Sequence, residues 1–214
     1  MLQKIWDFIF DAKFQLPMKY INIFSYYIVP LYLVGYFSFL YITWGDTYNS
    51  ARELGEIAFQ LLLLILFIKP LTQIFIDVKI FTKILILRRQ LWVILFWVFL
   101  FHGLGILYLE GFLNIQLFAY FTTLDSYLLW GSLAGSIIFL LGITSNTFSV
   151  KLLKRNWKRL HMLVFLALVF VALHIYFIAG DIRPIGMLWI LIVLKVLAKK
   201  WFKLPIKDYF IKKL

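Results

Sequence analysis

The sequence predicts an all-α membrane protein, a bundle of six transmembrane helices with both termini in the cytoplasm. Three observations predict this fold. Of the 214 residues, 64% are hydrophobic, well above the share of about 45–50% that is typical of soluble domains. Several apolar stretches reach the length of about 20 residues that a helix needs to cross the hydrocarbon core. Basic residues gather in alternate connections between these stretches, as they do on the cytoplasmic side of membrane proteins.

The first 19 residues precede the predicted spans and mix aromatic with charged side chains, for example Trp6 with Lys4. Such a mixture suits an amphipathic segment that lies on the cytoplasmic membrane surface. Hydropathy then predicts the first span over residues 20–44 and the second over residues 54–76.

The third span is predicted over residues 91–109, directly after Arg88 and Arg89. Residues 111–123 are apolar but too short to cross, so we expect them to rest at the membrane interface. The last three spans are predicted over residues 126–148, 160–179 and 184–198. The sixth is the shortest, and Lys195 interrupts it, although a lysine near a helix end can extend its charge to the membrane surface. Residues 201–214 form a basic cytoplasmic tail.

Charge fixes the orientation of these spans. Of the 22 Lys and Arg residues, all except Arg52 and Arg183 fall in the N-terminal segment, the 2–3 and 4–5 connections or the C-terminal end. The positive-inside rule places those regions in the cytoplasm, as in a multi-pass protein of a bacterial inner membrane. The net charge of +12 is due to basic residues that gather on this one side. We therefore expect the chain to contact membrane lipid and to bind no nucleic acid. The opposite connections carry Asp46, Glu53, Glu56, Glu110, Asp125 and Asp181.

All three histidines, His102, His161 and His174, fall inside or at the ends of predicted spans. Ionisable side chains within a membrane are rare and often functional, and imidazole is a common haem ligand in helical bundles. The alternative is that each histidine merely forms a hydrogen bond to a neighbouring helix.

Depth in the membrane favours ligation for two of them. His102 lies 13 residues after Arg89, and His174 lies 15 residues after Arg159. Because the third and fifth spans both start in the cytoplasm, they are expected to run parallel, and at 1.5 Å per residue both histidines lie about 20 Å above their basic neighbours. We therefore predict that His102 and His174 bind one haem iron from opposite sides, between the third and fifth helices.

Small residues near these histidines leave room for a macrocycle. Gly105 follows His102 by three residues, and Ala167 precedes His174 by seven; ordinary close packing of helices is the alternative explanation. Gly131 and Gly135 form a G-x-x-x-G pattern on the fourth span, which predicts helix packing.

His161 lies about 20 Å below His174, at the cytoplasmic end of the fifth span. The matching level of the third span contains no histidine. Three roles stay open: His161 ligates a second haem with an unusual partner, it lines a flavin or quinone site near the basic residues Arg88, Arg89 and Arg159, or it caps its helix.

Other motifs are missing from the sequence, and this limits the chemistry. The chain has no cysteine, which excludes disulfides, iron–sulfur clusters and covalent haem attachment. It also has no G-x-G-x-x-G turn for a nicotinamide cofactor, so electrons would come from within the bilayer or from another protein.

Several short motifs occur in a familiar order. They are Leu54-Gly55, Lys69-Pro70-Leu71, Arg88-Arg89 ahead of His102, Thr144-Ser145, Trp157-Lys158-Arg159-Leu160-His161 and His174-Ile175-Tyr176. In this order and spacing the chain resembles ferric-reductase-like transmembrane domains, specifically the haem-binding membrane subunits of the bacterial MsrPQ type, over residues 18–200. It departs from the family pattern at Lys69 and Trp92.

The resemblance implies a ferric-reductase-like transmembrane domain over residues 20–200 that binds haem b, with flavin mononucleotide (FMN) left open as a second cofactor. It also implies electron transfer from quinol or a cytoplasmic flavin reductase to a periplasmic molybdenum-containing methionine sulfoxide reductase.

Two other functions stay open. One is a transmembrane subunit that reduces ferric or cupric chelates. The other is a small transporter or assembly factor without a cofactor, although the spans lack the paired carboxylates of many ion-coupled transporters.

Overall fold

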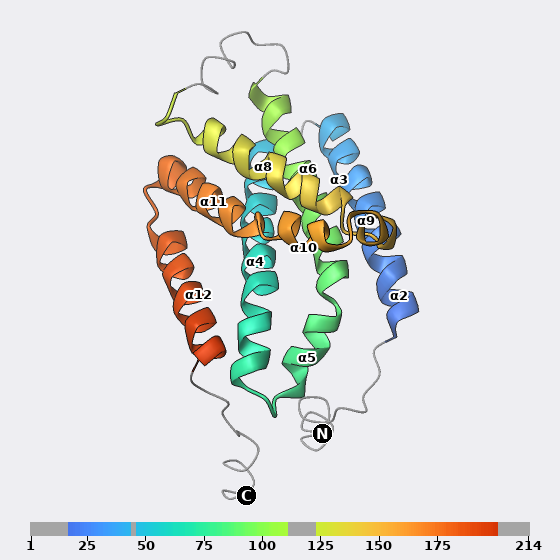
Figure 1. Cartoon of the computed structure of the whole chain (residues 1–214). Helices are drawn as coiled ribbons and strands as arrows, with labels where there is room; N and C mark the ends of the chain where they lie inside the picture. Colours follow the sequence, from blue (N-terminus) through green and yellow to red (C-terminus); the bar gives the residue numbers. More distant parts are fainter. Residues whose placement is uncertain (1–16, 44–45, 111–122, 201–214) are drawn as a thin grey trace, which may run out of the picture.

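The computed structural model describes residues 17–43, 46–110 and 123–200, and all regular structure in these ranges is helical (Figure 1). The all-helical prediction is therefore confirmed for this part of the chain. The predicted surface segment up to residue 16, most of the predicted interfacial segment and the basic tail lie outside the described residues.

The helices of the N-terminal half begin with a nearly continuous rod. It consists of α2 (Met18–Ile23), one π-helical turn η1 (Phe24–Ile28) and α3 (Val29–Thr43). The next three helices are α4 (Thr47–Ile74), α5 (Lys79–Ile86) and α6 (Arg88–Glu110). The C-terminal half contains α8 (Tyr127–Ile143), α9 (Thr147–Leu153), α10 (Arg155–His161), α11 (Val164–Ala179) and α12 (Arg183–Lys200).

Four helical segments are long and apolar enough to cross a membrane: Met18–Thr43, Thr47–Ile74, Arg88–Leu109 and Arg155–Ala179. A fifth is added if α8 and α9 together count as one bent span. The chain is therefore a multi-pass membrane protein. The sixth span, which would be α12, and the cytoplasmic position of both termini stay predictions.

The predicted fourth span is wrong at its end. The chain leaves α8 after Ile143 and bends by 96° before α9 begins at Thr147. Asn146 stabilises the bend from both sides, because its Nδ2 donates to the carbonyl of Ile143 (2.7 Å) and its Oδ1 accepts from the backbone N–H of Ser149 (2.8 Å). An asparagine that caps the next helix in this way is a strong start signal.

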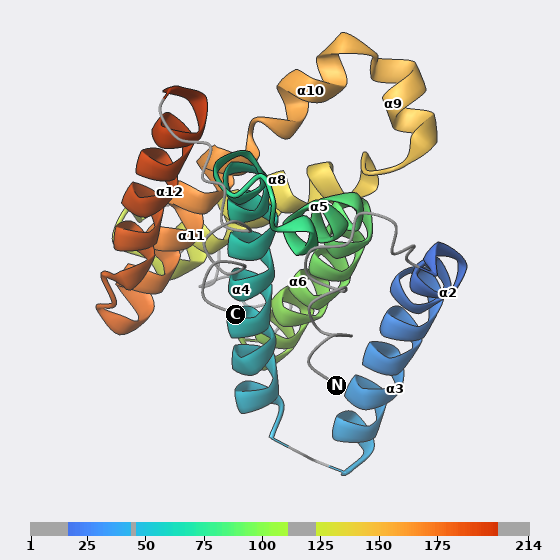
Figure 2. The ribbon, with the colours of Figure 1, turned by 90° about the horizontal axis from the view of Figure 1, so that it is seen from below.

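The membrane helices form two tightly packed pairs. α6 packs mainly on α4, and α11 mainly on α8; α8 also contacts α6, and α12 contacts α4 and α11 (Figures 1 and 2). The sequence predicted parallel third and fifth spans, but in Figure 1 the axis of α11 is steeply inclined to that of α6.

The two pairs share one core. Its fully buried side chains come from both pairs and from α12, and they include Leu62, Ile65, Leu95, Leu141, Leu168 and Leu191. In lipid, where the surroundings are as apolar as the core, such close packing stabilises the association of helices through van der Waals contact. The core thus holds α6 and α11 in fixed positions relative to each other.

Candidate functional site

The structure brings His102 of α6 and His174 of α11 together. Their imidazole rings are 6.3 Å apart, centre to centre, and nearly perpendicular, with an interplanar angle of 80°. Both side chains are partly buried. The two residues selected by depth along the sequence are therefore neighbours across the gap between the helix pairs.

Each imidazole is oriented by a backbone carbonyl of its partner helix. Nδ1 of His102 lies 2.7 Å from the carbonyl oxygen of Ala51 in α4, and Nδ1 of His174 lies 2.8 Å from that of Tyr127 in α8. A carbonyl can only accept, so each Nδ1 donates. In a neutral ring this leaves the lone pair on Nε2, which is the form in which histidine binds metals.

Two glycines lie against these rings. A Cβ atom on Gly55 of α4 would lie 2.8 Å from Cε1 of His102, and one on Gly131 of α8 would lie 2.7 Å from Nδ1 of His174. Real Cβ atoms do not approach so closely, so only glycine leaves space for the imidazoles at these two positions.

The pair fits a haem iron held between two axial ligands. A metal–imidazole bond is about 2 Å long, so rings on opposite sides of one metal have centres roughly 6 Å apart once the ring radii are added. The observed 6.3 Å agrees with this separation. Two histidines suffice for a haem, because the porphyrin supplies the other four nitrogens.

The small residues predicted to make room for a macrocycle have a different role. A Cβ on Gly105 would lie 2.9 Å from Cβ of Ala51 and 3.1 Å from the ring of Phe37, so Gly105 serves the packing of α6 on its neighbours. Ala167 is fully buried in the common core. The predicted G-x-x-x-G packing holds for Gly135, which faces Phe99 of α6, whereas Gly131 faces His174.

His161 is buried at the end of α10 among aromatic side chains. Its ring centre lies 4.0 Å from that of Trp157 and 6.2 Å from that of Trp92. Its Nε2 lies 3.4 Å from Oγ1 of Thr144. The structure thus places His161 in a cluster of its own.

Of the three arginines predicted near a flavin or quinone site, only Arg88 joins this cluster. It is partly buried and close enough to His161 to interact with it electrostatically. Its buried Nε has no hydrogen-bond partner within the described part of the chain. Arg89 and Arg159 are exposed.

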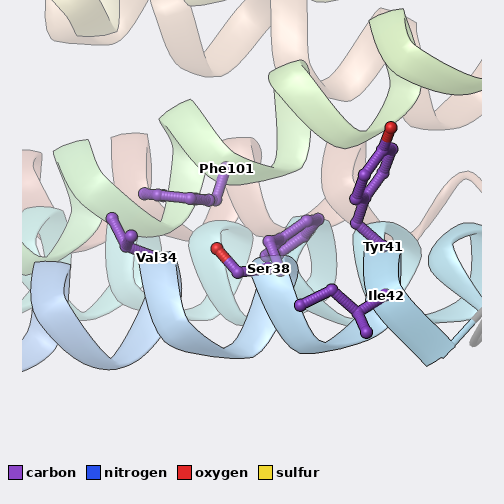
Figure 3. A pocket seen from close by; sticks show the side chains of 6 residues that line it. Val34, Ser38, Tyr41, Ile42 and Phe101 are labelled. Atoms are coloured by element: carbon purple, nitrogen blue, oxygen red, sulfur yellow. The ribbon is translucent and has the colours of Figure 1, made fainter.

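A shallow hollow of about 350 Å³ opens on the outer side of α3, where α3 meets α6 (Figure 3). Its walls are mostly apolar, with two hydroxyl groups; they are formed by Val34, Phe37, Ser38, Tyr41, Ile42 and Phe101. Phe101, which lines the hollow, directly precedes His102 in α6.

Sequence reasoning did not place Gly55 and Gly131 beside the histidine rings and did not find the two carbonyls. The sequence alone does not single out Gly131, because Gly135 and Gly142 lie on the same helix.

Comparison with known proteins indicates the family. No family model and no solved structure match the chain. A curated relative, the protein-methionine-sulfoxide reductase heme-binding subunit MsrQ of Agrobacterium fabrum, is 31% identical over 166 residues, which cover 74% of this chain and 74% of the relative. With two facing histidines on separate membrane helices and this similarity over most of its length, the chain belongs to the MsrQ family.

Proposed function

We propose that the chain is the haem-binding membrane subunit of a methionine sulfoxide reductase system, and that it holds haem b between His102 and His174. One observation carries the proposal. The two ring centres lie 6.3 Å apart while each Nδ1 donates to a carbonyl, which leaves the lone pair of each neutral ring on Nε2 for iron. The relative in Agrobacterium fabrum is named as a heme-binding subunit, which agrees with this assignment.

Haem bound there would supply a one-electron carrier without an open coordination position, which favours electron transfer over oxygen activation. The chain's own contribution is to orient the two ligands, through Ala51 and Tyr127, and to surround them with apolar helices.

The acceptor in this proposal is a periplasmic molybdenum-containing methionine sulfoxide reductase. The carbonyls that hold the histidines belong to the start of α4 and the start of α8. Exposed carboxylates lie beside them, at Asp46, Glu53, Glu56 and Asp125. This supports docking of a soluble acceptor with a basic face next to the haem, because complementary charge accelerates encounter.

The donor in this proposal is quinol or a cytoplasmic flavin reductase. The hollow lined by Phe101 supports quinol, because it is open, mostly apolar and offers the hydroxyls of Ser38 and Tyr41. Reduction of the haem in purified protein by a short-chain quinol, compared with reduction by a flavin reductase and NADH, distinguishes the two donors.

A second cofactor, FMN, is proposed at the cytoplasmic end of α6. The support is the buried Nε of Arg88 without a partner among the described residues, next to His161. Arg89 and Arg159 lie on the same side of the membrane in the predicted topology and would add positive charge for the phosphate.

Replacement of the proposed ligands tests the haem assignment. We expect His102→Ala and His174→Ala each to lose most of the bound haem, since loss of one axial ligand removes about half of the protein's bonds to iron. The measurement is the ratio of Soret absorbance to protein after purification. Leu104→Ala is the control, because Leu104 lies on the same helix and is 41% exposed. Full Soret absorbance in both histidine variants contradicts the assignment.

A further inference from the structure

We infer that Gly55 and Gly131 are positioning residues for the two iron ligands: each leaves the space through which an imidazole reaches a backbone carbonyl. The inference rests on the proposed function, in that the imidazoles are taken to ligate haem. The contacts that support it, between Gly55 and His102 and between Gly131 and His174, lie within the chain itself.

The same local geometry occurs twice. Gly55 follows Ala51 by four residues in α4, and Gly131 follows Tyr127 by four residues in α8. In an α-helix the carbonyl of residue i points toward the N–H of residue i+4. A donor that uses the second lone pair of that oxygen therefore passes beside residue i+4, where a side chain would obstruct it.

The distances agree with this explanation at both positions. A Cβ on Gly55 would lie 2.8 Å from Cε1 and 2.9 Å from Nδ1 of His102. A Cβ on Gly131 would lie 2.7 Å from Nδ1 and 3.0 Å from Cε1 of His174. The obstructed atoms thus include the nitrogen that donates to the carbonyl, so an added methyl group would displace the ring from its hydrogen bond.

Other glycines have other neighbours. Gly135 and Gly142 of α8 would meet the rings of Phe99 and Phe96, and Gly103 of α6 would meet nothing within 4 Å. Among the glycines that the structure describes, only Gly55 and Gly131 would touch an imidazole. General helix packing therefore does not explain this pair.

Loss of the hydrogen bond has a chemical consequence for a metal ligand. The bond from Nδ1–H to an acceptor fixes the tautomer, orients the ring and increases the basicity of Nε2, and loss of such a partner typically weakens metal binding about 10–100-fold. An imidazole without this hydrogen bond would stabilise ferric iron less than the hydrogen-bonded imidazole does, so the midpoint potential of the haem would rise.

The experiment compares four single variants of the purified full-length chain: Gly55→Ala, Gly131→Ala, Gly103→Ala and Gly135→Ala. Haem affinity is measured by titration, the midpoint potential by redox titration, the ligand field by electron paramagnetic resonance, and folding by circular dichroism. Gly103→Ala is the matched control, since Gly103 adjoins His102 and faces open space. Gly135→Ala tests general packing, because its Cβ would lie 2.5 Å from the Phe99 ring.

We expect haem affinity about 10–100-fold lower, a more positive potential and an altered low-spin signal in Gly55→Ala and Gly131→Ala. Gly103→Ala and Gly135→Ala should retain the wild-type potential and signal. If one of the first two variants does not fold, the other decides, because they lie in different helix pairs.

Wild-type affinity, potential and signal in both Gly55→Ala and Gly131→Ala overturn the inference. So does an equal shift in Gly135→Ala, because general packing would then account for it. A wild-type chain that binds no haem overturns the proposed function itself.

Discussion

The three histidines differ in what their ring nitrogens contact. His102 and His174 each donate from Nδ1 to a carbonyl on a neighbouring helix, which leaves the lone pair of the neutral ring on Nε2. In His161 the Nε2 instead lies 3.4 Å from Oγ1 of Thr144, and the ring stacks on Trp157. Only the first two have the geometry of a matched pair of ligands.

Replacement of His161 tests this difference. We expect His161→Ala to retain the haem held by the other two histidines. It should lose flavin, because the proposed flavin site consists of His161 together with Arg88. Haem and flavin are both quantified after extraction from purified protein, with His174→Ala as the comparison. If His161→Ala loses haem to the same extent as His174→Ala, then His161 is itself an iron ligand.

At this scale the sequence predicted the meeting of His102 and His174, because their distances from Arg89 and Arg159 place them at similar depth. It could not predict Gly55 and Gly131 as neighbours of the rings. Which glycine faces a histidine depends on the rotation of one helix against another, and periodicity within one helix does not determine that rotation.

Among the secondary-structure elements, the break between α8 and α9 shapes the end of the bundle that the topology prediction places in the cytoplasm. It directs α9 and α10 away from the axis of α8 (Figure 2) and lets Trp157 donate from Nε1 to the carbonyl of Thr144, at 2.9 Å. The same bond brings His161, four residues further on, against the end of α8.

Removal of the asparagine cap tests the importance of the bend. Asn146→Ala should lower the free energy of unfolding by about 1 kcal/mol, since both the N-cap bond to Ser149 and the bond to Ile143 are lost. Thermal unfolding in detergent, followed by circular dichroism, measures the change. Ser149→Ala is the control, because Ser149 takes part through its backbone N–H alone. Equal stability of the two variants would show that the cap does not hold the bend.

Helix positions were predictable because long apolar runs between charged residues have few alternatives in lipid. The ends were less so. Residues 144–147 are polar but uncharged, and the predicted span was extended through them to Phe148, across the bend that Asn146 makes. The second span was predicted to begin at residue 54, but α4 begins at Thr47. Asp46 caps α4 by accepting a hydrogen bond from the N–H of Asn49 at 2.9 Å.

For the whole molecule, the segregation of charge matters most. α4 begins beside Asp46 and ends after Lys69, whereas α11 follows Arg159 and ends before Asp181. Acidic and basic ends therefore alternate along the chain as a multi-pass topology requires. The inclination of α11 to α6 was not predictable, because it depends on the packing of complete helix pairs.

The topology can be tested directly because the chain has no cysteine. Single cysteines replace exposed residues on opposite sides, as Asp125→Cys and Lys151→Cys. We expect a membrane-impermeant maleimide to label Asp125→Cys in intact cells, and Lys151→Cys only after the inner membrane is opened. The reverse pattern would invert the predicted orientation and remove the argument for a periplasmic acceptor.

The central claim is that one iron lies between His102 and His174. Its most direct test is the absorption spectrum of the purified wild-type chain, oxidised and reduced, together with the ratio of haem to protein and the response of the reduced form to carbon monoxide. We expect low-spin haem b with both axial positions filled, and a spectrum unchanged by carbon monoxide. A colourless protein, or high-spin haem that binds carbon monoxide readily, would contradict it.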